Sequence, residues 1–510
     1  MFLQRIVTNY IRNTTTRSFH ATSRTEMAEG KHKNNNNNKN KHNNKNRNNQ
    51  KSASPPPPRS NNGSTTQSSN NNGTSRFGDK GLKDVVLVEG VRTPYATSGT
   101  VYKDLMGYDL GRMALEGLIE RSAADYSAID YVVMGTVIQE AKTPNIAREC
   151  MLGAGFPDTI PSHTVTMACI SSNRAATTGM ELIRSNQAGA VVVGGVETMS
   201  DVPIRVSRKL RKRLIGMQKV SKKGPLAIAK HMLSGLSTKE LFGLELPAIA
   251  EFSTNEIMGH SADRLAAKFG VSRAAQDEFA VRSHLSAAKA TEQNKLWDVL
   301  SVTPAPKFDV ISQDNGIRGD MSLEKISKLK PAFIKPHGTI TAASSSFLTD
   351  GASAALISSA EHAKKQGWKP KAYLRDYIWT AQDPKEELLL GPAYSIARLL
   401  HRNNLTLDDF DVIEMHEAFA GQVLANLEAL NSDRFCTQSI GVPSKVGEIN
   451  MDKLNVLGGS LSLGHPFAAT GVRLISTAAN RLVQEDGQLA LIAACAAGGL
   501  GHGMIVERAN

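Results

Sequence analysis

Short apolar runs alternate with stretches of helical periodicity from about residue 84 to the end of the chain. Residues 83–89, 129–135 and 188–195 are rich in Val, which predicts buried strands. Residues 114–121 have the spacing of a helix, and residues 90–94 are typical of a turn. Because strand and helix patterns alternate, we predict an α/β protein with a mainly parallel central sheet.

The second half of the chain repeats part of this pattern in weaker form. Three segments of the second half each resemble an earlier segment, an apolar run matching an apolar run and a helical stretch matching a helical stretch. The paired segments are 410–416 with 129–135, 477–481 with 180–184, and 488–494 with 190–193. Such pairs indicate an internal duplication.

Length and cysteine content narrow the class of protein. The chain has 510 residues, and the part from 84 to 510 is long enough to bury a large core. Its four cysteines form no CxxC pair, which argues against a disulfide framework or a zinc site and favours a reducing compartment. No run approaches 18 apolar residues, so we expect no membrane-spanning helix.

The N-terminal region differs in composition from the rest. The first 24 residues contain four Arg and no acidic residue, with apolar residues between them. This composition is typical of a mitochondrial transit peptide, which we place at 1–25, although a disordered basic tail is the alternative. Residues 26–80 are largely Asn-rich and low in apolar side chains, which predicts a disordered linker. They lack aromatic residues to stack bases until Phe77, so we expect no nucleic-acid binding.

A second basic region lies inside the chain and contributes to the net charge of +12. Residues 202–239 contain eleven Lys and Arg and no acidic residue, with apolar residues interleaved. This pattern predicts a basic amphipathic helix that lies on a membrane surface or docks a partner subunit. A solvated surface helix and a contact with CoA phosphates are the alternatives.

Three reactive side chains stand out by their surroundings. Each lies in a short segment of small and apolar residues: Cys169 in 163–173, His465 in 463–471 and Cys495 in 491–499. A thiolate is the nucleophilic form of cysteine, and a helix N-terminus or a nearby imidazole favours it. One Cys to attack, a His to activate it and a second Cys to move a proton are sufficient for acyl transfer. The alternative is that both cysteines are inert core residues.

These three segments closely resemble the signature segments of the thiolase family. A fourth, residues 414–421, matches where most thiolases carry Asn-Glu-Ala-Phe, but here a histidine, His416, precedes Glu417. That histidine resembles the branch of mitochondrial trifunctional β subunits. Further stretches similar to that branch are 251–263, 329–336, 345–351 and 370–375. The resemblance covers about residues 84 to 508, and four motifs in the right order are far more specific than one.

The resemblance implies a thiolase fold of two duplicated α/β halves, in layers of helices and sheets, with an inserted loop domain. The N-terminal half is expected at 84–358, with the loop domain at about 205–309, and the C-terminal half at 359–510. It also implies cleavage of medium- or long-chain 3-ketoacyl-CoA to acetyl-CoA and a shortened acyl-CoA. Coenzyme A is then a co-substrate, with no permanently bound cofactor and no metal.

The resemblance assigns roles to residues of this chain. Cys169 is the nucleophile, His465 the base, Cys495 the proton donor to the leaving carbanion, and His416 orients a water at the thioester oxygen. Glu417 is a candidate to orient a catalytic histidine. Residues expected to contact CoA are Ser344, Ser346 and Gly498. Ser344 departs from the branch, which usually has Asn there, and Cys495-Ala-Ala497 departs from the usual Cys-x-Gly.

The resemblance further implies a homodimer, assembly with a trifunctional α subunit, and a place in the mitochondrial matrix against the inner membrane. Three alternatives stay open or are disfavoured by particular residues. Condensing enzymes of the ketoacyl-synthase type lack a second catalytic cysteine, so Cys495 argues against them. A non-catalytic lipid-binding module is disfavoured by the intact Cys169, His465 and Cys495 set. A biosynthetic acetoacetyl-CoA thiolase uses the same residues, so direction stays open.

Overall fold

The computed structural model describes residue 81 and residues 84–509, apart from 236, 238–239, 241, 249 and 305–308. The chain divides into two compact units, 1–71 and 72–510, and all described residues belong to the second. The predicted transit peptide at 1–25 and linker at 26–80 therefore lie outside the described residues.

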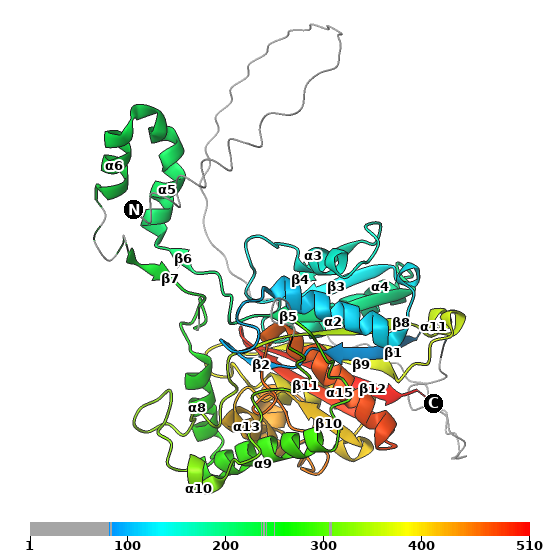
Figure 1. Ribbon diagram of the computed structural model, residues 1–510. Coiled ribbons are helices and arrows are strands. Elements are labelled where there is room, and N and C mark those ends of the chain that lie inside the picture. The colour runs from blue at the N-terminus through cyan, green and yellow to red at the C-terminus, as the bar shows by residue number, and fades with distance from the viewer. Residues whose placement is uncertain are drawn as a thin grey trace, which may run out of the picture. The chain divides into compact units, whose positions relative to one another are not determined.

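Ten strands of this unit form one hydrogen-bonded sheet (Figure 1). Nine of them follow the order β10-β11-β12-β9-β1-β8-β5-β3-β4, and β2 pairs with β8. Their bounds are β1 Val85–Arg92, β2 Ala96–Thr97, β3 Tyr131–Gly135, β4 Ser162–Val165, β5 Ala190–Glu197, β8 Thr349–Ser359, β9 Ala372–Ala381, β10 Val412–Met415, β11 Leu489–Ala496 and β12 Leu500–Arg508. The predicted strands thus correspond to β1, β3 and β5.

The strand order shows the duplication that the sequence pattern indicates. The first half contributes β4-β3-β5-β8-β1 and the second β10-β11-β12-β9, and the two halves meet where β1 pairs with β9. In the second half, a parallel bridge between Ile413 and Leu454 takes the place of the β3–β4 pair. Counted outward from the β1–β9 junction, the strands of the two halves therefore follow the same order and the same pattern of parallel and antiparallel pairing.

The prediction of a mainly parallel sheet is wrong. Among the pairs of named strands in the described residues, only β10–β11, β3–β4 and β3–β5 are parallel, and the pairs along the middle of the order are antiparallel. The reason lies in how each half closes. β12 returns directly from β11 as a hairpin, and β8 lies antiparallel to both β5 and β1. Alternating strand and helix patterns do not reveal such returning strands.

The turn expected at residues 90–94 begins later than predicted, because Gly90 to Arg92 belong to β1 and pair with β8. Gly90 serves a close contact instead of a turn. A Cβ on Gly90 would overlap the Ser476 side chain of helix α15. A glycine in a strand often marks such an approach.

Helices cover both faces of the sheet and fill the space between its halves (Figure 1). The main ones are α2 Gly107–Ser122, α3 Ile146–Gly153, α4 Ser171–Arg184, α8 Met258–Lys268, α9 Arg273–Glu292, α12 Gly391–Asn403, α13 Ala420–Asn431 and α15 Thr470–Gln484. The short ones are α10 Leu323–Ile326, α11 Ala360–Gln366 and α14 Asp433–Phe435. The helix expected at 114–121 is the second half of α2.

Alternating strand residues separate the core into three layers. In β3, Val132 and Met134 pack with α2 and α3, whereas Val133 packs with α4 and α15. In β10, Val412 joins the same central layer and Ile413 faces α12 and α13. Strands with apolar residues on both faces require cover on both sides. As a result, α4 and α15 lie in contact at the centre of the fold, one from each half.

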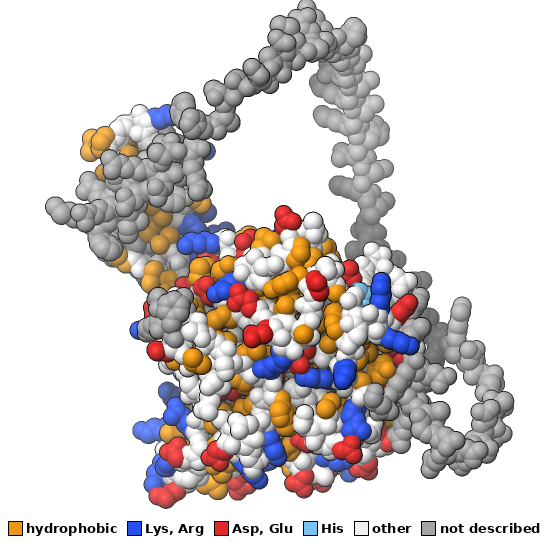
Figure 2. Space-filling view, turned by 45° about the vertical axis from the view of Figure 1, so that its right-hand side comes forward, with side chains coloured by type: hydrophobic (Ala, Val, Ile, Leu, Met, Phe, Trp, Pro, Cys, Tyr) orange, Lys and Arg blue, Asp and Glu red, His pale blue; other side chains and the backbone are white. Residues whose placement is uncertain are grey.

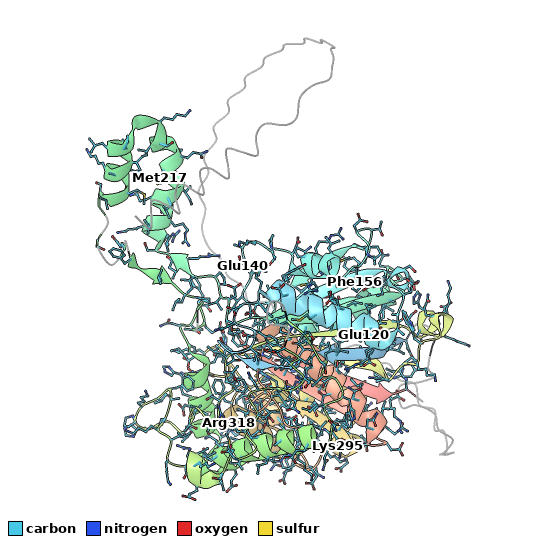
Figure 3. The ribbon with its side chains drawn as sticks, in the orientation of Figure 1. Glu120, Glu140, Phe156, Met217, Lys295 and Arg318 are labelled. Atoms are coloured by element: carbon cyan, nitrogen blue, oxygen red, sulfur yellow. The ribbon has the colours of Figure 1, made fainter. Side chains whose placement is uncertain are left out.

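A long connection runs from β5 to β8 and contains the basic region. In its described part, the basic region forms two α-helices, α5 Arg208–Val220 and α6 Pro225–Leu233, in place of the one amphipathic helix expected, and Met217 lies on α5 (Figure 3). The break falls at Gly224, whose φ of 89° is left-handed, followed by Pro225 at the start of α6. Beside them β6 Arg205–Val206 pairs with β7 Leu244–Glu245.

Neither basic helix contains a buried residue, and large apolar side chains such as Ile215, Leu226 and Leu233 are exposed. Hydrophobic and basic side chains are visible on this segment in Figure 2, and hydrophobic, acidic and basic side chains are interspersed over the sheet and its covering helices. Among the residues that the structure describes, we find no helix with the length and apolar character needed to cross a bilayer.

Candidate active site

Cys169 lies in a tight turn between β4 and α4. Ala168, directly before it, has a φ of 47°, a left-handed conformation that is uncommon for a residue other than glycine. The Ser171 hydroxyl holds the turn, since it accepts from the Met167 N–H at 2.8 Å and donates to the Ala168 carbonyl at 2.7 Å. The turn places the Cys169 thiol at the N-terminus of α4, where the helix dipole favours a negative charge.

His465 lies in the corresponding turn before α15. Gly464, directly before it, has a φ of 110°, and the His465 N–H donates to the Thr349 hydroxyl at 3.0 Å. On the ring, Nδ1 lies 2.7 Å from the Thr470 hydroxyl at the start of α15. His465 is 3% exposed, and its Nε2 has no hydrogen-bond partner among the described residues. That nitrogen is therefore free to act on a neighbouring group.

Small residues bring these two turns together. Gly471 packs against α4, and a Cβ there would overlap the Asn173 side chain and lie 2.6 Å from its backbone nitrogen. The Val472 N–H donates to the Ser172 hydroxyl at 3.0 Å, which ties α15 to α4 directly. Any side chain at residue 471 would push the two helix starts apart.

His416 follows β10 and is fully buried. Its Nδ1 lies 3.0 Å from the Ser460 hydroxyl, which also accepts from the Arg473 guanidinium at 3.2 Å. Its ring centre is 4.2 Å from that of His465, and its Nε2 also has no partner in the described part of the chain. Glu417, considered as the orienting group, instead accepts from Ser283, Asn455 and the Leu461 N–H. That expectation is wrong, because the imidazole rings of His416 and His465 bond to Ser460 and Thr470 and not to this carboxylate.

The structure brings Cys169, His416 and His465 into one cluster. One ring nitrogen from each histidine and the Cys169 sulfur all lie within 4.8 Å of one another. The three residues lie beside α4, β10 and α15, so both halves contribute. A thiol next to two imidazoles with free nitrogens has the composition of a nucleophile with a base.

Cys495 lies on β11 and is 1% exposed. It is close enough to Cys169 that the charge of that thiolate would raise the pKa of Cys495. The backbone N–H of Ala497, two residues on, is close enough to the Cys169 sulfur to lower the pKa of the thiol. Gly498, by contrast, is exposed with a φ of 86°, and its N–H donates to Glu251 at 2.7 Å. The C-terminal motif thus lies against the thiol through Ala497.

Burial dominates the electrostatics of the cluster. It raises the pKa of Cys169 to about 12, and the Ala497 N–H offsets only part of this. It also lowers the pKa of His465 to about 3, with a smaller contribution from Arg473. The pKa of His416 is lowered well below its usual value by burial and then by His465 and Arg473, and burial raises that of Cys495. The resting site therefore holds neutral thiols and neutral imidazoles at pH 7.

The segment with the predicted CoA contacts lies beside the His416 loop. Ser344 is fully buried and its hydroxyl accepts from the Thr341 N–H at 2.8 Å, while its carbonyl accepts from Ala420 at 2.9 Å. Ser346 is partly exposed, and its N–H donates to the Ala418 carbonyl at 2.9 Å. The roles of Ser344, Ser346 and Gly498 toward CoA stay predictions.

Comparison with known proteins identifies the family. The model of the thiolase N-terminal domain matches residues 85–361, and that of the thiolase C-terminal domain matches residues 368–508. The chain belongs to the thiolase family. A probable 3-ketoacyl-CoA thiolase of Caenorhabditis elegans is 57% identical over 434 residues, which is 85% of this chain and 96% of the relative. The mitochondrial trifunctional enzyme subunit beta of Mus musculus is 57% identical over 428 residues, 84% of this chain and 88% of the relative.

Solved structures show the same fold. Human mitochondrial 3-ketoacyl-CoA thiolase matches with a TM-score of 0.71 at 27% identity, over 84% of this chain and all of that structure. The acetyl-CoA acetyltransferase of Bacillus anthracis matches with a TM-score of 0.71 at 29% identity and the same coverage. The predicted thiolase fold is confirmed.

Sequence reasoning missed the groups that orient the two histidines of this thiolase. Thr470 lies within the segment 463–471, yet only a fold shows that its hydroxyl reaches back to the His465 ring. Ser460 lies 44 residues from His416 and carries no local signal. For Thr470, the sequence signal is a hydroxyl residue four or five positions after a candidate histidine, at the expected start of a helix. Such a residue is placed to hydrogen-bond the histidine ring.

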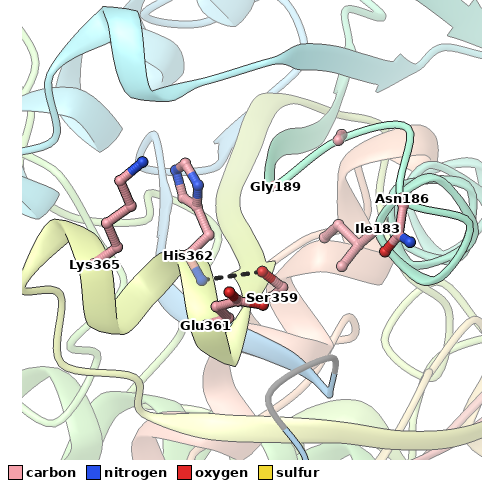
Figure 4. A pocket seen from close by; sticks show the side chains of 8 residues that line it. Ile183, Asn186, Gly189, Ser359, Glu361, His362 and Lys365 are labelled. Atoms are coloured by element: carbon pink, nitrogen blue, oxygen red, sulfur yellow. Dashed lines mark hydrogen bonds between the residues drawn. The ribbon is translucent and has the colours of Figure 1, made fainter.

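A separate cavity of about 300 Å³ lies away from this cluster, between the end of α4 and α11 (Figure 4). Its lining consists of Ile183, Asn186, Ala188, Gly189, Ser359, Glu361, His362 and Lys365. His362 is held there by bonds from its backbone N–H to Ser359 and from its ring to the Ala128 carbonyl. None of the predicted site residues lines this cavity.

Proposed function

We propose that this thiolase is an acetyl-CoA C-acyltransferase that cleaves 3-ketoacyl-CoA with CoA. The products are acetyl-CoA and an acyl-CoA shortened by two carbons, which is the last step of fatty-acid β-oxidation. The relatives at 57% identity support this reaction, since they are named as a 3-ketoacyl-CoA thiolase and trifunctional β subunits. The observation that carries it is the convergence of Cys169, His416 and His465 within 4.8 Å.

The first half-reaction forms an acyl-enzyme. Because thiol and imidazole are both neutral at rest, His465 Nε2 takes the Cys169 proton as the sulfur attacks the C3 ketone. The C2–C3 bond then breaks, and its electron pair leaves with the acetyl-CoA fragment as an enolate. Cys495 gives its proton to that carbon, and the acyl group stays on Cys169 as a thioester.

The second half-reaction returns the enzyme to its starting state. An incoming CoA thiol loses its proton to a base of the site, and the CoA sulfur attacks the thioester. Cys169 leaves as thiolate, is reprotonated, and the shortened acyl-CoA departs. The negative oxygen of each step needs a donor that is already in place. The His465 ring, with a water oriented by His416, serves the thioester oxygen, and backbone N–H groups at Cys169 and Ala497 serve the other.

The parts of the chain have separate tasks in this proposal. Residues 84–358 and 359–510 form the two catalytic halves, and the loop domain at about 205–309 belongs to the first. Coenzyme A is the co-substrate, contacted by Ser344, Ser346 and Gly498. Medium- and long-chain acyl groups are the expected substrates.

The names of the trifunctional β relatives, which call them mitochondrial, support a proposal on assembly and location. We propose a homodimer that binds an α subunit in the mitochondrial matrix, imported by the segment 1–25. The exposed apolar and basic side chains of α5 and α6 suit contact with an anionic membrane surface, where each basic residue near the surface contributes about 1 kcal/mol. Co-sedimentation with vesicles of neutral and of anionic phospholipid tests this: substitution of Arg211 and Lys212 by Glu should abolish binding to the anionic ones.

Substrate consumption tests the activity and its direction. CoA-dependent loss of 3-ketohexadecanoyl-CoA and of acetoacetyl-CoA is measured for wild type, Cys169→Ala and the matched control Cys436→Ala. We expect long-chain cleavage in the wild type and the control, and at least a thousandfold less in Cys169→Ala, about the cost of removing a catalytic nucleophile. Preference for acetoacetyl-CoA would favour the biosynthetic alternative. A folded wild type that cleaves neither substrate would favour a lipid-binding module.

A further inference from the structure

The catalytic cluster contains three possible metal-ligand atoms that lie close together. The Cys169 sulfur and one nitrogen each from His416 and His465 lie within 4.8 Å of one another. In a tetrahedral zinc site the same atom types are about 3.3 to 3.6 Å apart, given Zn–S and Zn–N bonds of about 2.3 and 2.0–2.1 Å. Small side-chain rotations, of about an ångström at the ligand atoms, are enough to close the triangle.

Both histidines are already oriented as metal ligands are. Their Nδ1 atoms lie at hydroxyl oxygens, Thr470 for His465 and Ser460 for His416. Their Nε2 atoms are buried and have no partner among the described residues. A ligating histidine typically bonds through one nitrogen to the metal and through the other to such a partner. Two buried nitrogens without partners are costly, and a metal ion would satisfy both.

We propose that Zn²⁺ binds at Cys169 Sγ, His416 Nε2 and His465 Nε2, and that it holds the enzyme in a reversibly inhibited state. On binding, the Cys169 thiol releases its proton to solvent and its sulfur donates an electron pair to the metal. The fourth position takes water or the CoA thiolate. The proposed binding site depends only on the geometry of the three side chains, whereas the proposed inhibition rests on the proposed function. With zinc bound, the Cys169 sulfur is unable to attack the ketone and the His465 nitrogen is unable to accept a proton.

The donor set selects the class of metal. A thiolate and two imidazoles bind zinc and similar borderline or soft cations, and Mg²⁺ or Ca²⁺ require oxygen ligands that this triad lacks. Nearby charged side chains both favour and oppose the binding of a cation. The carboxylates of Glu197 and Glu251 lie close enough to raise the pKa of Cys169 and would attract a cation, while the Arg473 guanidinium near the histidines opposes one. The thiolate charge and two neutral donors are the deciding contribution.

Sequence spacing gave no sign of such a site. The four cysteines form no CxxC pair, and the three ligands lie in segments separated by 247 and 49 residues, from 169 to 416 and from 416 to 465. Only the packing of α4, β10 and α15 assembles the triad.

Metal binding to the full chain tests the site. Zn²⁺ and Co²⁺ are titrated into wild type, Cys169→Ser and His416→Asn, with Cys436→Ser and His163→Asn as matched controls outside the triad. We expect one tight Zn²⁺ in wild type and controls, with a thiolate-to-cobalt charge-transfer band for Co²⁺. We expect the band to vanish in Cys169→Ser and the Zn²⁺ affinity to fall at least about tenfold in His416→Asn. Equal stoichiometry and affinity in all five proteins would overturn the site.

A second measurement needs only the wild type, so it decides even if a variant fails to fold. Zn²⁺ should protect Cys169 from iodoacetamide and inhibit thiolysis, chelation should restore both, and Mg²⁺ should do neither. Unchanged alkylation of Cys169 at saturating Zn²⁺ would refute the proposal. If Zn²⁺ binds the triad but no thiolysis exists without metal, the proposed function fails and the site stands. If thiolysis is normal and Zn²⁺ neither binds nor protects, only the metal site fails.

Discussion

The turn before α4 and the turn before α15 occupy corresponding places in the two halves, yet they hold different chemistry. In each, a residue with positive φ comes directly before the reactive one: Ala168 at 47° before Cys169, and Gly464 at 110° before His465. The two turns differ on the C-terminal side of the reactive residue. α4 begins two residues after the cysteine, whereas a 3-10 turn, Phe467–Ala469, separates His465 from α15.

That difference suits each residue to its role. Cys169 lies at the helix start, where the dipole favours a thiolate. The extra turn after His465 lets the first residue of α15, Thr470, reach back to the imidazole and hold it. A duplicated frame thus sets the two reactive groups side by side, and local turn geometry decides which is nucleophile and which is base.

The largest expected effect comes from removing the base. His465→Ala should lower kcat about a thousandfold, since general base catalysis contributes about 10²–10⁴. It should also slow iodoacetamide alkylation of Cys169, because burial keeps that thiol protonated without a base. Steady-state kinetics and alkylation rates measure both. A loss below tenfold in kcat would show that the two turns do not work as a pair.

Next in size is the contact that joins the turns. Gly471→Ala should destabilise the fold by about 1–3 kcal/mol, the usual cost of overpacking, and lower kcat, because the new Cβ meets the backbone of Asn173. Gly107→Ala on α2 is the matched control, since the atoms nearest to a Cβ there belong to side chains and lie 3.4 Å or more away. Chemical denaturation compares them. Equal costs would mean that the close approach at residue 471 has no special role.

A smaller effect is expected from the group that orients the base. Thr470→Val removes the hydroxyl at His465 Nδ1 and keeps the shape of the side chain. We expect kcat to fall about tenfold, the lower end for partners that orient a functional histidine, with KM little changed. Thr470→Ser, which keeps the hydroxyl, should restore kcat. A rise in KM alone would indicate a role in substrate binding.

The smallest effect concerns the backbone of the two turns. Ala168→Gly makes the first turn resemble the second and relieves left-handed strain of about 1–2 kcal/mol. The gain offsets the higher entropy of glycine in the unfolded chain, so we expect stability within about 1 kcal/mol of wild type. Ala288→Gly within α9 lacks that relief and should lose about 1 kcal/mol. A larger loss for Ala168→Gly than for Ala288→Gly would contradict this account.

Local pattern was enough to predict β1, β3, β5, much of α2 and the repeat between the halves, because alternating burial is written into neighbouring residues. Local pattern failed to predict strand direction, since nothing in the sequence of β8 or β12 indicates that these strands run antiparallel to their neighbours. It also failed at Gly90, where a glycine that serves a helix contact has the appearance of a turn.

The sequence by itself determined which reactive residues this protein has and the small, apolar segments that hold them: Cys169, His465, Cys495 and, through the family resemblance, His416. The tertiary structure alone decided that Cys169, His416 and His465 meet within 4.8 Å, and that Ser460 and Thr470 hold the two rings. The physical reason is distance along the chain. Periodicity reports the environment of neighbours, whereas contacts between residues about 300 positions apart arise only when α4 and α15 pack in one layer.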